Sequence, residues 1–225
     1  MIKNIIKKMF VLFAFIGVNS QALAEGQTYF WKVSDLARAP SETIELRNDS
    51  NHIIKTLSTQ QMLYLYSAMS AITESSEVIA EFTITTGKSP NAFASTTASG
   101  QDFIAINFAM LDLLGTNIDM AAALIGHELA HLKLGHGAER REALERNGNS
   151  SFSVSNTRYS RDNEREADYL GTVWTVEAGF DPQGAVALQE AIYKSSRSGS
   201  SASVTHPSGI ERITVLKSLV RRLSK

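Results

Sequence analysis

Three of the five histidines in this 225-residue chain fall within ten consecutive residues, HELAHLKLGH, which run from His127 to His136. The surrounding segment, IDMAAALIGHELAHLKL, is predicted to form a helix. On a helix, His127 and His131 lie on one face, one turn apart, so both imidazoles can bind one metal ion. This spacing indicates a helix that presents a pair of candidate metal ligands.

Glu128 follows the first of these histidines and lies about 100° further around the helix axis. From there its carboxylate can reach a water molecule held by the metal, although it does not share the histidine face. The pattern H-E-x-x-H is the arrangement of two zinc ligands and a general base that metalloproteases use. The simpler alternative is a helix that exposes two histidines and binds no metal.

A hydrolytic zinc site requires a third protein ligand and one open position. His136 follows His131 by five residues, but the metzincin pattern requires its third histidine at the next position, where this chain has Gly137. Gly135 is also expected to end the helix before His136. His136 is therefore interpreted as a residue that supports the site or the fold from outside the ligand set.

The segment NEREAD, residues 163–168, contains a better third ligand. Glu164 and Asp168 are four residues apart on a predicted helix, so they share a face. Glu164 could bind the ion, and Asp168 could accept the free ring N–H of a ligating histidine and so fix its tautomer. The alternative is a solvated charged helix face. Glu166 lies about 200° from Glu164 and is expected to face away.

The first 24 residues have the three parts of a secretory signal peptide. Lysines precede an uninterrupted apolar run at residues 9–18, and the small-residue sequence Ala22-Leu23-Ala24 follows. The run is shorter than the roughly 20 residues that span a membrane. We expect cleavage after Ala24, export to the periplasm, and a mature chain, residues 25–225, that forms a single domain and does not span the membrane.

Composition narrows the class of protein further. The chain is 43% hydrophobic and 20% charged, which is typical of a globular protein with a core. Its net charge of −1 argues against a nucleic-acid partner, because such proteins usually carry a basic excess. The absence of cysteine from the sequence excludes disulfides, thiolate metal ligands and a cysteine nucleophile.

The remaining segments predict an α+β fold that is mostly α, with a small sheet of about three strands packed on the histidine-bearing helix. Strands are expected at residues 78–86, 92–97 and 102–107. Helices are expected from a Ser58 cap to about residue 75, from Asn117 or Asp119 to Gly135 or Gly137, at 161–178, from 182 to about 193, and after a capping box at 208–211. Residues 25–55 show no clear pattern, and residues 147–160 are expected to form a polar loop.

Taken together, these motifs resemble peptidase family M48, the group of HtpX and the CAAX prenyl proteases. The resemblance rests on H-E-x-x-H with a histidine five residues further on, and on E-x-x-x-D some thirty residues later. It extends over about residues 58–218 and includes NAFA at 91–94, SRDNEREADYLG at 160–171, AGFDP at 178–182 and THPSGIER at 205–212.

The resemblance implies a gluzincin-type metallopeptidase domain with one zinc ion per chain. The ion would be held by His127, His131 and Glu164. Glu128 would be the catalytic acid and base, and Asp168 would be a carboxylate that supports a ligating histidine. Because the sequence shows no spanning helices, helical repeats or lipidation cysteine, the chain resembles short periplasmic members of the family.

The expected activity is endopeptidase hydrolysis of unfolded or damaged cell-envelope proteins, as in protein quality control. The substrate is expected to add an extended strand to a sheet edge, either near Asn91, Ala92, Phe93 and Ala94 or along residues 103–107. Docking to envelope assembly machinery stays open. The alternative function is a protease-like module that binds unfolded clients, in which the zinc is latent or structural.

His206 follows the Ser-rich segment 195–205 and precedes a proline. Three interpretations compete: a fourth zinc ligand that plugs the site, a hydrogen-bond donor to the transition state, or a surface histidine. Truncation of His206 would raise activity in the first case and lower it in the second.

Overall fold

A computed structural model of the protein describes residues 28–139, 142, 154–197 and 209–223. The predicted signal peptide, residues 1–24, and His206 lie outside these ranges. The fold is of the α+β class and mostly helical, as expected. Within the described residues, none of the helices combines the length and hydrophobicity that a bilayer-spanning segment requires.

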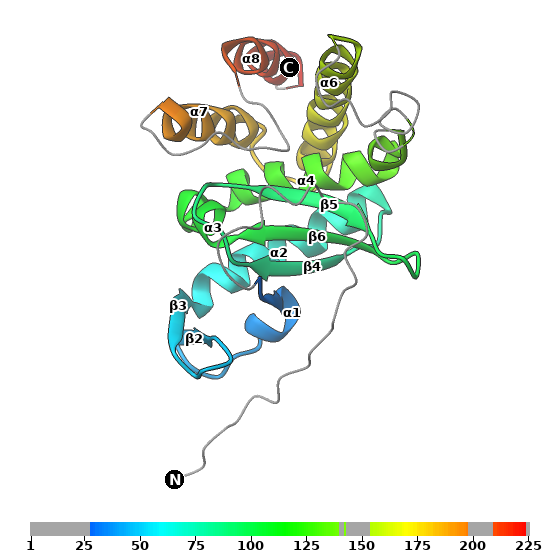
Figure 1. Ribbon diagram of the computed structural model, residues 1–225. Coiled ribbons are helices and arrows are strands. Elements are labelled where there is room, and N and C mark those ends of the chain that lie inside the picture. Colours follow the sequence, from blue (N-terminus) through cyan, green and yellow to red (C-terminus); the bar gives the residue numbers. More distant parts are fainter. Residues whose placement is uncertain (1–27, 140–141, 143–153, 198–208, 224–225) are drawn as a thin grey trace.

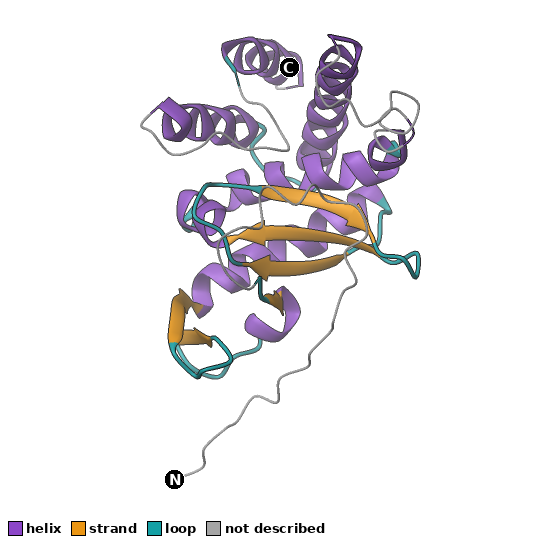
Figure 2. Ribbon diagram, in the orientation of Figure 1, coloured by secondary structure: helices purple, strands orange, loops and turns teal. Residues whose placement is uncertain are grey.

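A four-stranded sheet forms one layer of the molecule (Figure 2). Its strands, in spatial order, are β1 (Phe30–Lys32), β4 (Glu81–Thr85), β6 (Asp102–Asn107) and β5 (Ala92–Thr96). The two central strands, β4 and β6, run parallel, while β1 and β5 pair antiparallel with β4 and β6. The sheet therefore ends in β1 on one side and in β5 on the other.

One face of the sheet forms the core. Alternate side chains of the two central strands are buried on this face: Phe82 and Ile84 from β4, and Ile104 and Ile106 from β6. Behind them lie α2 (Thr59–Ser76) and α4 (Ile118–Lys133) (Figure 1). Such alternation is the sequence signal from which a strand was predicted at residues 78–86.

Helix α4 lies at the centre of the fold. Every residue from Met120 to Ala130 is buried, which is typical of a helix enclosed between two layers. The sheet covers one side of α4, α6 and α7 pack on the other, and α8 packs in turn on α6 and α7 (Figure 1). These outer helices are α6 (Val154–Glu177), α7 (Gln183–Arg197) and α8 (Ile210–Leu223).

The N-terminal part contains structure that the sequence did not reveal. Residues 25–55 were left unassigned, yet they include strand β1 and helix α1 (Val33–Leu36). They also include β2 (Thr43–Arg47), which forms a hairpin with β3 (Ile53–Ser58). The expectation of about three strands in the main sheet was therefore one too low. A three-residue strand such as β1 is too short to show a period and is defined by its pairing with β4.

One predicted boundary and one predicted capping bond also differ from the structure. The polar segment 147–160 was expected to be a loop, but α6 begins at Val154. The Ser- and Asn-rich sequence of this segment has a low helix propensity. Propensity is a weak guide, however, and here the segment extends the helix that follows it. Ser58 occupies the N-cap position of α2, but its side chain makes no capping hydrogen bond. The cap of α4 is as expected, because the Asn117 side chain accepts a hydrogen bond from the Met120 N–H.

The end of α4 agrees with the sequence. The helix ends at Lys133, and Gly135 adopts a positive φ of 71°, a conformation that glycine adopts without strain. A short helical segment follows at residues 136–139.

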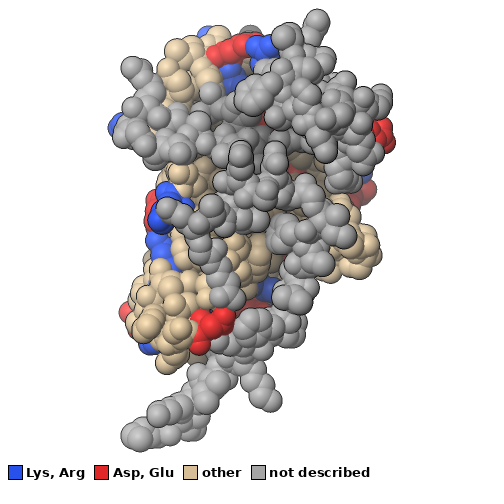
Figure 3. Space-filling model, viewed as in Figure 1, with Lys and Arg blue, Asp and Glu red and all other residues tan. Residues whose placement is uncertain are grey.

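On the face shown in Figure 3, the described acidic and basic side chains lie in small adjacent groups, with no extended basic area among them.

Candidate metal centre

The site is built where α4 and α6 cross with their backbones in contact. A Cβ atom added to Gly126 would lie 2.7 Å from the Gly171 carbonyl oxygen, and one added to Gly171 would lie 2.6 Å from the His127 nitrogen. Only glycine permits this approach at either position. Because Gly126 directly precedes His127, the contact brings the histidine-bearing face of α4 against α6.

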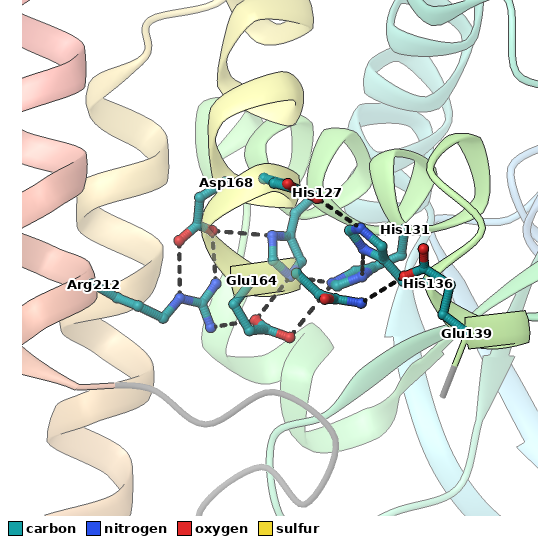
Figure 4. A network of polar contacts seen from close by, with 9 residues as sticks. His127, His131, His136, Glu139, Glu164, Asp168 and Arg212 are labelled. Carbon is teal, nitrogen blue, oxygen red and sulfur yellow. Dashed lines mark hydrogen bonds and ion pairs between the residues drawn. The ribbon is translucent and has the colours of Figure 1, made fainter. Parts of the chain in front are cut away.

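Three predicted ligands converge at this crossing, namely His127 and His131 from α4 and Glu164 from α6 (Figure 4). The two Nε2 atoms of the histidines are 3.0 Å apart. The Glu164 carboxylate oxygens lie 3.4 Å from His127 Nε2 and 3.6 Å from His131 Nε2. All three side chains therefore point at one position between the helices.

These separations fit a tetrahedral ion. Zinc binds histidine nitrogen and carboxylate oxygen at about 2.0–2.2 Å, which separates two ligand atoms of a tetrahedral site by about 3.3–3.6 Å. The three measured separations, from 3.0 to 3.6 Å, are close to this range. Three protein ligands leave one tetrahedral position for water or substrate, as in catalytic rather than structural zinc sites.

The other ring nitrogen of His127 faces Asp168. His127 Nδ1 lies 3.0 Å from Asp168 Oδ1, so the Asp168 carboxylate holds the ring with Nε2 directed at the cluster. Burial lowers the pKa of His127, but Asp168 and Glu164 outweigh this effect and raise the pKa to about 10. The metal-free site therefore retains a proton on His127, since the two carboxylates favour a positive charge there.

Arg212 in α8 completes the site and was not predicted from the sequence. Its Nε and Nη2 atoms donate to the two oxygens of Asp168 at 2.9 and 2.7 Å, and its Nη1 lies 2.7 Å from Glu164 Oε2 (Figure 4). Burial opposes the charge of Asp168, yet the pKa of that carboxyl group lies below its ordinary value because the Arg212 and His127 charges stabilise the anion.

The charges of the site favour a divalent cation. Glu128, Glu164 and Asp168 contribute three buried carboxylates, and Arg212 contributes one buried guanidinium. Two negative charges are thus left in a region of low polarity, and burying them uncompensated is unfavourable. A proton on His127 compensates one of them, whereas a divalent ion compensates both.

His136 lies against His131. The Nδ1 atoms of the two rings are 2.9 Å apart, and His136 is not in the group whose ligand atoms converge. On its other side, His136 Nε2 is 3.3 Å from Glu166 Oε2. Glu166 is mostly exposed and is not among the converging ligands, but its contact with His136 was not foreseen.

Glu128 is buried in α4, with only 1% of its surface exposed. It is close enough to Arg212 to contribute to raising the Arg212 pKa. Because Glu128 directly follows the candidate ligand His127 on α4, it is the candidate general base of the site.

The predicted substrate edge corresponds to strand β5. Asn91 and Asn107 form a hydrogen-bonded pair, as do Thr97 and Gln101 at the other end of the hairpin. Because hydrogen bonding alternates along an antiparallel ladder, the backbone of Ala94 points away from β6. This edge lies beside α4 (Figure 1).

The second predicted edge is wrong. Residues 103–107 belong to β6, which pairs with β4 on one side and with β5 on the other. The backbone groups of β6 are hydrogen-bonded within the sheet, so β6 has no free edge for a further strand.

The three interpretations of His206 stay predictions, because this residue lies outside the described ranges.

The sequence did contain a signal for Arg212. The residue ends the segment THPSGIER, which contributed to the family resemblance, but nothing in the local pattern assigns a role to this arginine. Arg165, by contrast, forms ion pairs at the surface with Asp162 and Glu211.

Comparison with known proteins agrees with this geometry. The model of peptidase family M48 matches residues 66–156 and 143–220, which together cover more than half of the chain. A search of curated proteins finds none that matches. The matched region includes the helices that carry the cluster and Arg212. The chain belongs to peptidase family M48.

Proposed function

We propose that this protein is a zinc-dependent endopeptidase of the gluzincin type, which hydrolyses unfolded or damaged proteins of the cell envelope. The observation that carries the proposal is the convergence of His127, His131 and Glu164 at separations suited to a tetrahedral ion. The N-terminal sequence, with its basic, apolar and small-residue parts, supports export to the periplasm.

The three converging side chains would hold the ion. Bound there, zinc supplies Lewis acidity that lowers the pKa of a water molecule toward neutrality and polarises the scissile carbonyl. Glu128 would be the general base of this site, which takes a proton from the attacking water molecule and gives it to the leaving amine. Asp168 keeps His127 in the orientation that directs Nε2 at the cluster, and Arg212 keeps Asp168 ionised.

Strand β5 supports the expected mode of substrate binding. An extended peptide can pair with the outward backbone groups of β5, next to the helix that carries the cluster. Such pairing involves the main chain of the peptide, so it requires an unfolded segment and depends little on its sequence. This requirement suits a protease that removes damaged proteins.

Replacement of Glu128 by Gln tests the mechanism. The variant is expected to bind zinc as the wild type does, because Glu128 is not among the converging ligands, and to lose cleavage of casein. Removal of a general base costs about 10²- to 10⁴-fold in rate. Glu74→Gln, at an exposed position on α2, is the matched control.

The outcomes separate the two functions considered. Cleavage by the Glu128→Gln variant with zinc retained would remove Glu128 from the mechanism. A wild type that holds zinc and binds unfolded casein but never cleaves it would favour the client-binding module instead. A wild type that binds no zinc would contradict both.

A further inference from the structure

A buried glutamine lies behind the metal centre. Gln189 is in α7 and only 5% of its surface is exposed. Among the described residues, no donor lies within hydrogen-bonding distance of its Oε1 atom. A buried amide oxygen without a partner is unfavourable, so such groups in native proteins usually bind an ordered water molecule.

A small cavity adjoins this amide. It offers about 10 Å³ to the centre of a water molecule, which is the space that one water requires. Four polar residues line it: Gln189 from α7, His127 from α4, and Asp168 and Thr172 from α6. A buried water needs two to four polar partners, and these four residues are the candidates.

We propose that Gln189 is a positioning residue for the metal centre, which holds one buried water molecule between its amide and the Asp168 carboxylate. The water donates one hydrogen to Gln189 Oε1 and the other to Asp168. Thr172 can donate nothing further, because its hydroxyl already donates to the Asp168 carbonyl oxygen at 2.6 Å.

This bridge would act on His127 through Asp168. The Asp168 carboxylate lies 3.0 Å from His127 Nδ1, so its orientation determines where Nε2 points. Arg212 binds the same carboxylate from α8, and the water adds a restraint from α7. The inference rests on the proposed zinc site, because the orientation of the His127 ring affects metal binding only if His127 is a metal ligand.

The test compares three variants by their zinc affinity and by the melting temperature of the metal-free protein. Gln189→Met keeps the length of the side chain and removes the amide. Leu188→Met, which lines the same cavity, is the matched control because it changes shape without changing hydrogen bonding. Gln189→Asn keeps the amide and is the conservative replacement.

Gln189→Met is expected to weaken zinc binding by about 10-fold or more, as loss of a residue that supports a ligand does. Its metal-free melting temperature should stay within about 3 °C of the wild type, or rise, since a buried polar group is replaced by an apolar one. Leu188→Met should retain wild-type zinc affinity, and Gln189→Asn should bind more tightly than Gln189→Met.

Equal zinc affinity of Gln189→Met and wild type would overturn the proposal, as would an equal loss in Leu188→Met. A crystal structure of the zinc-bound wild type at high resolution should show the bridging water, and a cavity without it would overturn the bridge. Failure of the wild type to bind zinc at all would refute the proposed function as well, so the two failures are distinguishable.

Discussion

The guanidinium of Arg212 binds both oxygens of the Asp168 carboxylate, through hydrogen bonds of 2.9 and 2.7 Å. A third nitrogen of the same group lies 2.7 Å from Glu164. One cation from α8 thus holds the carboxylate of a candidate ligand and the carboxylate that orients another ligand. Positioning of the metal centre therefore depends on a helix that contributes none of the converging ligand atoms.

Replacement of Arg212 by Lys should weaken zinc binding although the charge is kept. Lysine cannot form the planar, bidentate hydrogen bonds that Arg212 makes with Asp168. Its single ammonium group can contact Glu164 only if it loses the contact with Asp168. We expect a loss of about 10- to 100-fold in zinc affinity, measured by competition with a chelator. Arg221→Lys, on an exposed position of the same helix, should bind zinc normally.

Substitution at the helix crossing should separate the ligands. An alanine at position 126 would place its Cβ against the Gly171 carbonyl, so α4 and α6 must move apart or the protein must unfold. We expect Gly126→Ala to lower the free energy of unfolding by about 1–3 kcal/mol and to lose zinc binding. Urea titration measures the loss of stability, and competition with a chelator measures zinc binding. Gly209→Ala, where a Cβ meets nothing within 4 Å, should retain zinc binding in the same assay.

The stability of the metal-free protein should depend on the protonation of His127. Its pKa is raised from 6.5 to about 10 in the folded state, so the folded protein binds the proton more tightly than the unfolded chain. This contribution is complete below pH 6.5 and is lost as the pH rises through about 10. The melting temperature in chelator should fall over this range.

Asp168→Asn supplies the comparison for that pH dependence. Without the Asp168 charge, the folded protein holds the His127 proton less tightly, so the decline of the melting temperature should still begin near pH 6.5 but should end at a lower pH and be smaller. Identical pH profiles for the variant and the wild type would show that the Asp168–His127 pair does not control the titration. Zinc-loaded protein should show a flatter profile, because the metal replaces the proton.

Proline at position 94 should impair substrate binding without disturbing the sheet. The Ala94 backbone points away from β6, so loss of its N–H removes a bond offered to a substrate but none of the β5–β6 bonds. We expect a higher KM for unfolded casein with unchanged zinc affinity. Phe93→Pro, which removes an inward N–H, should instead destabilise the fold; cleavage by Ala94→Pro at the wild-type KM would contradict pairing along β5.

Local spacing determined the ligand candidates from the sequence alone. His127 and His131 share a helix face because they are four residues apart, and Glu164 and Asp168 do so for the same reason. The Asn117 cap of α4 and the end of this helix before Gly135 were also predicted from local sequence. The alternation of residues 78–86 likewise predicted the strand that the structure has as β4, Glu81–Thr85.

Tertiary structure decided what depends on packing between distant segments. Arg212 reaches Asp168 across 44 residues of sequence, and the contact of Gly126 with Gly171 exists only because two helices cross there. The order of strands likewise placed β5 at an edge and β6 inside the sheet. Periodicity describes which face a residue occupies on its own element, and it contains no information about which other element meets that face.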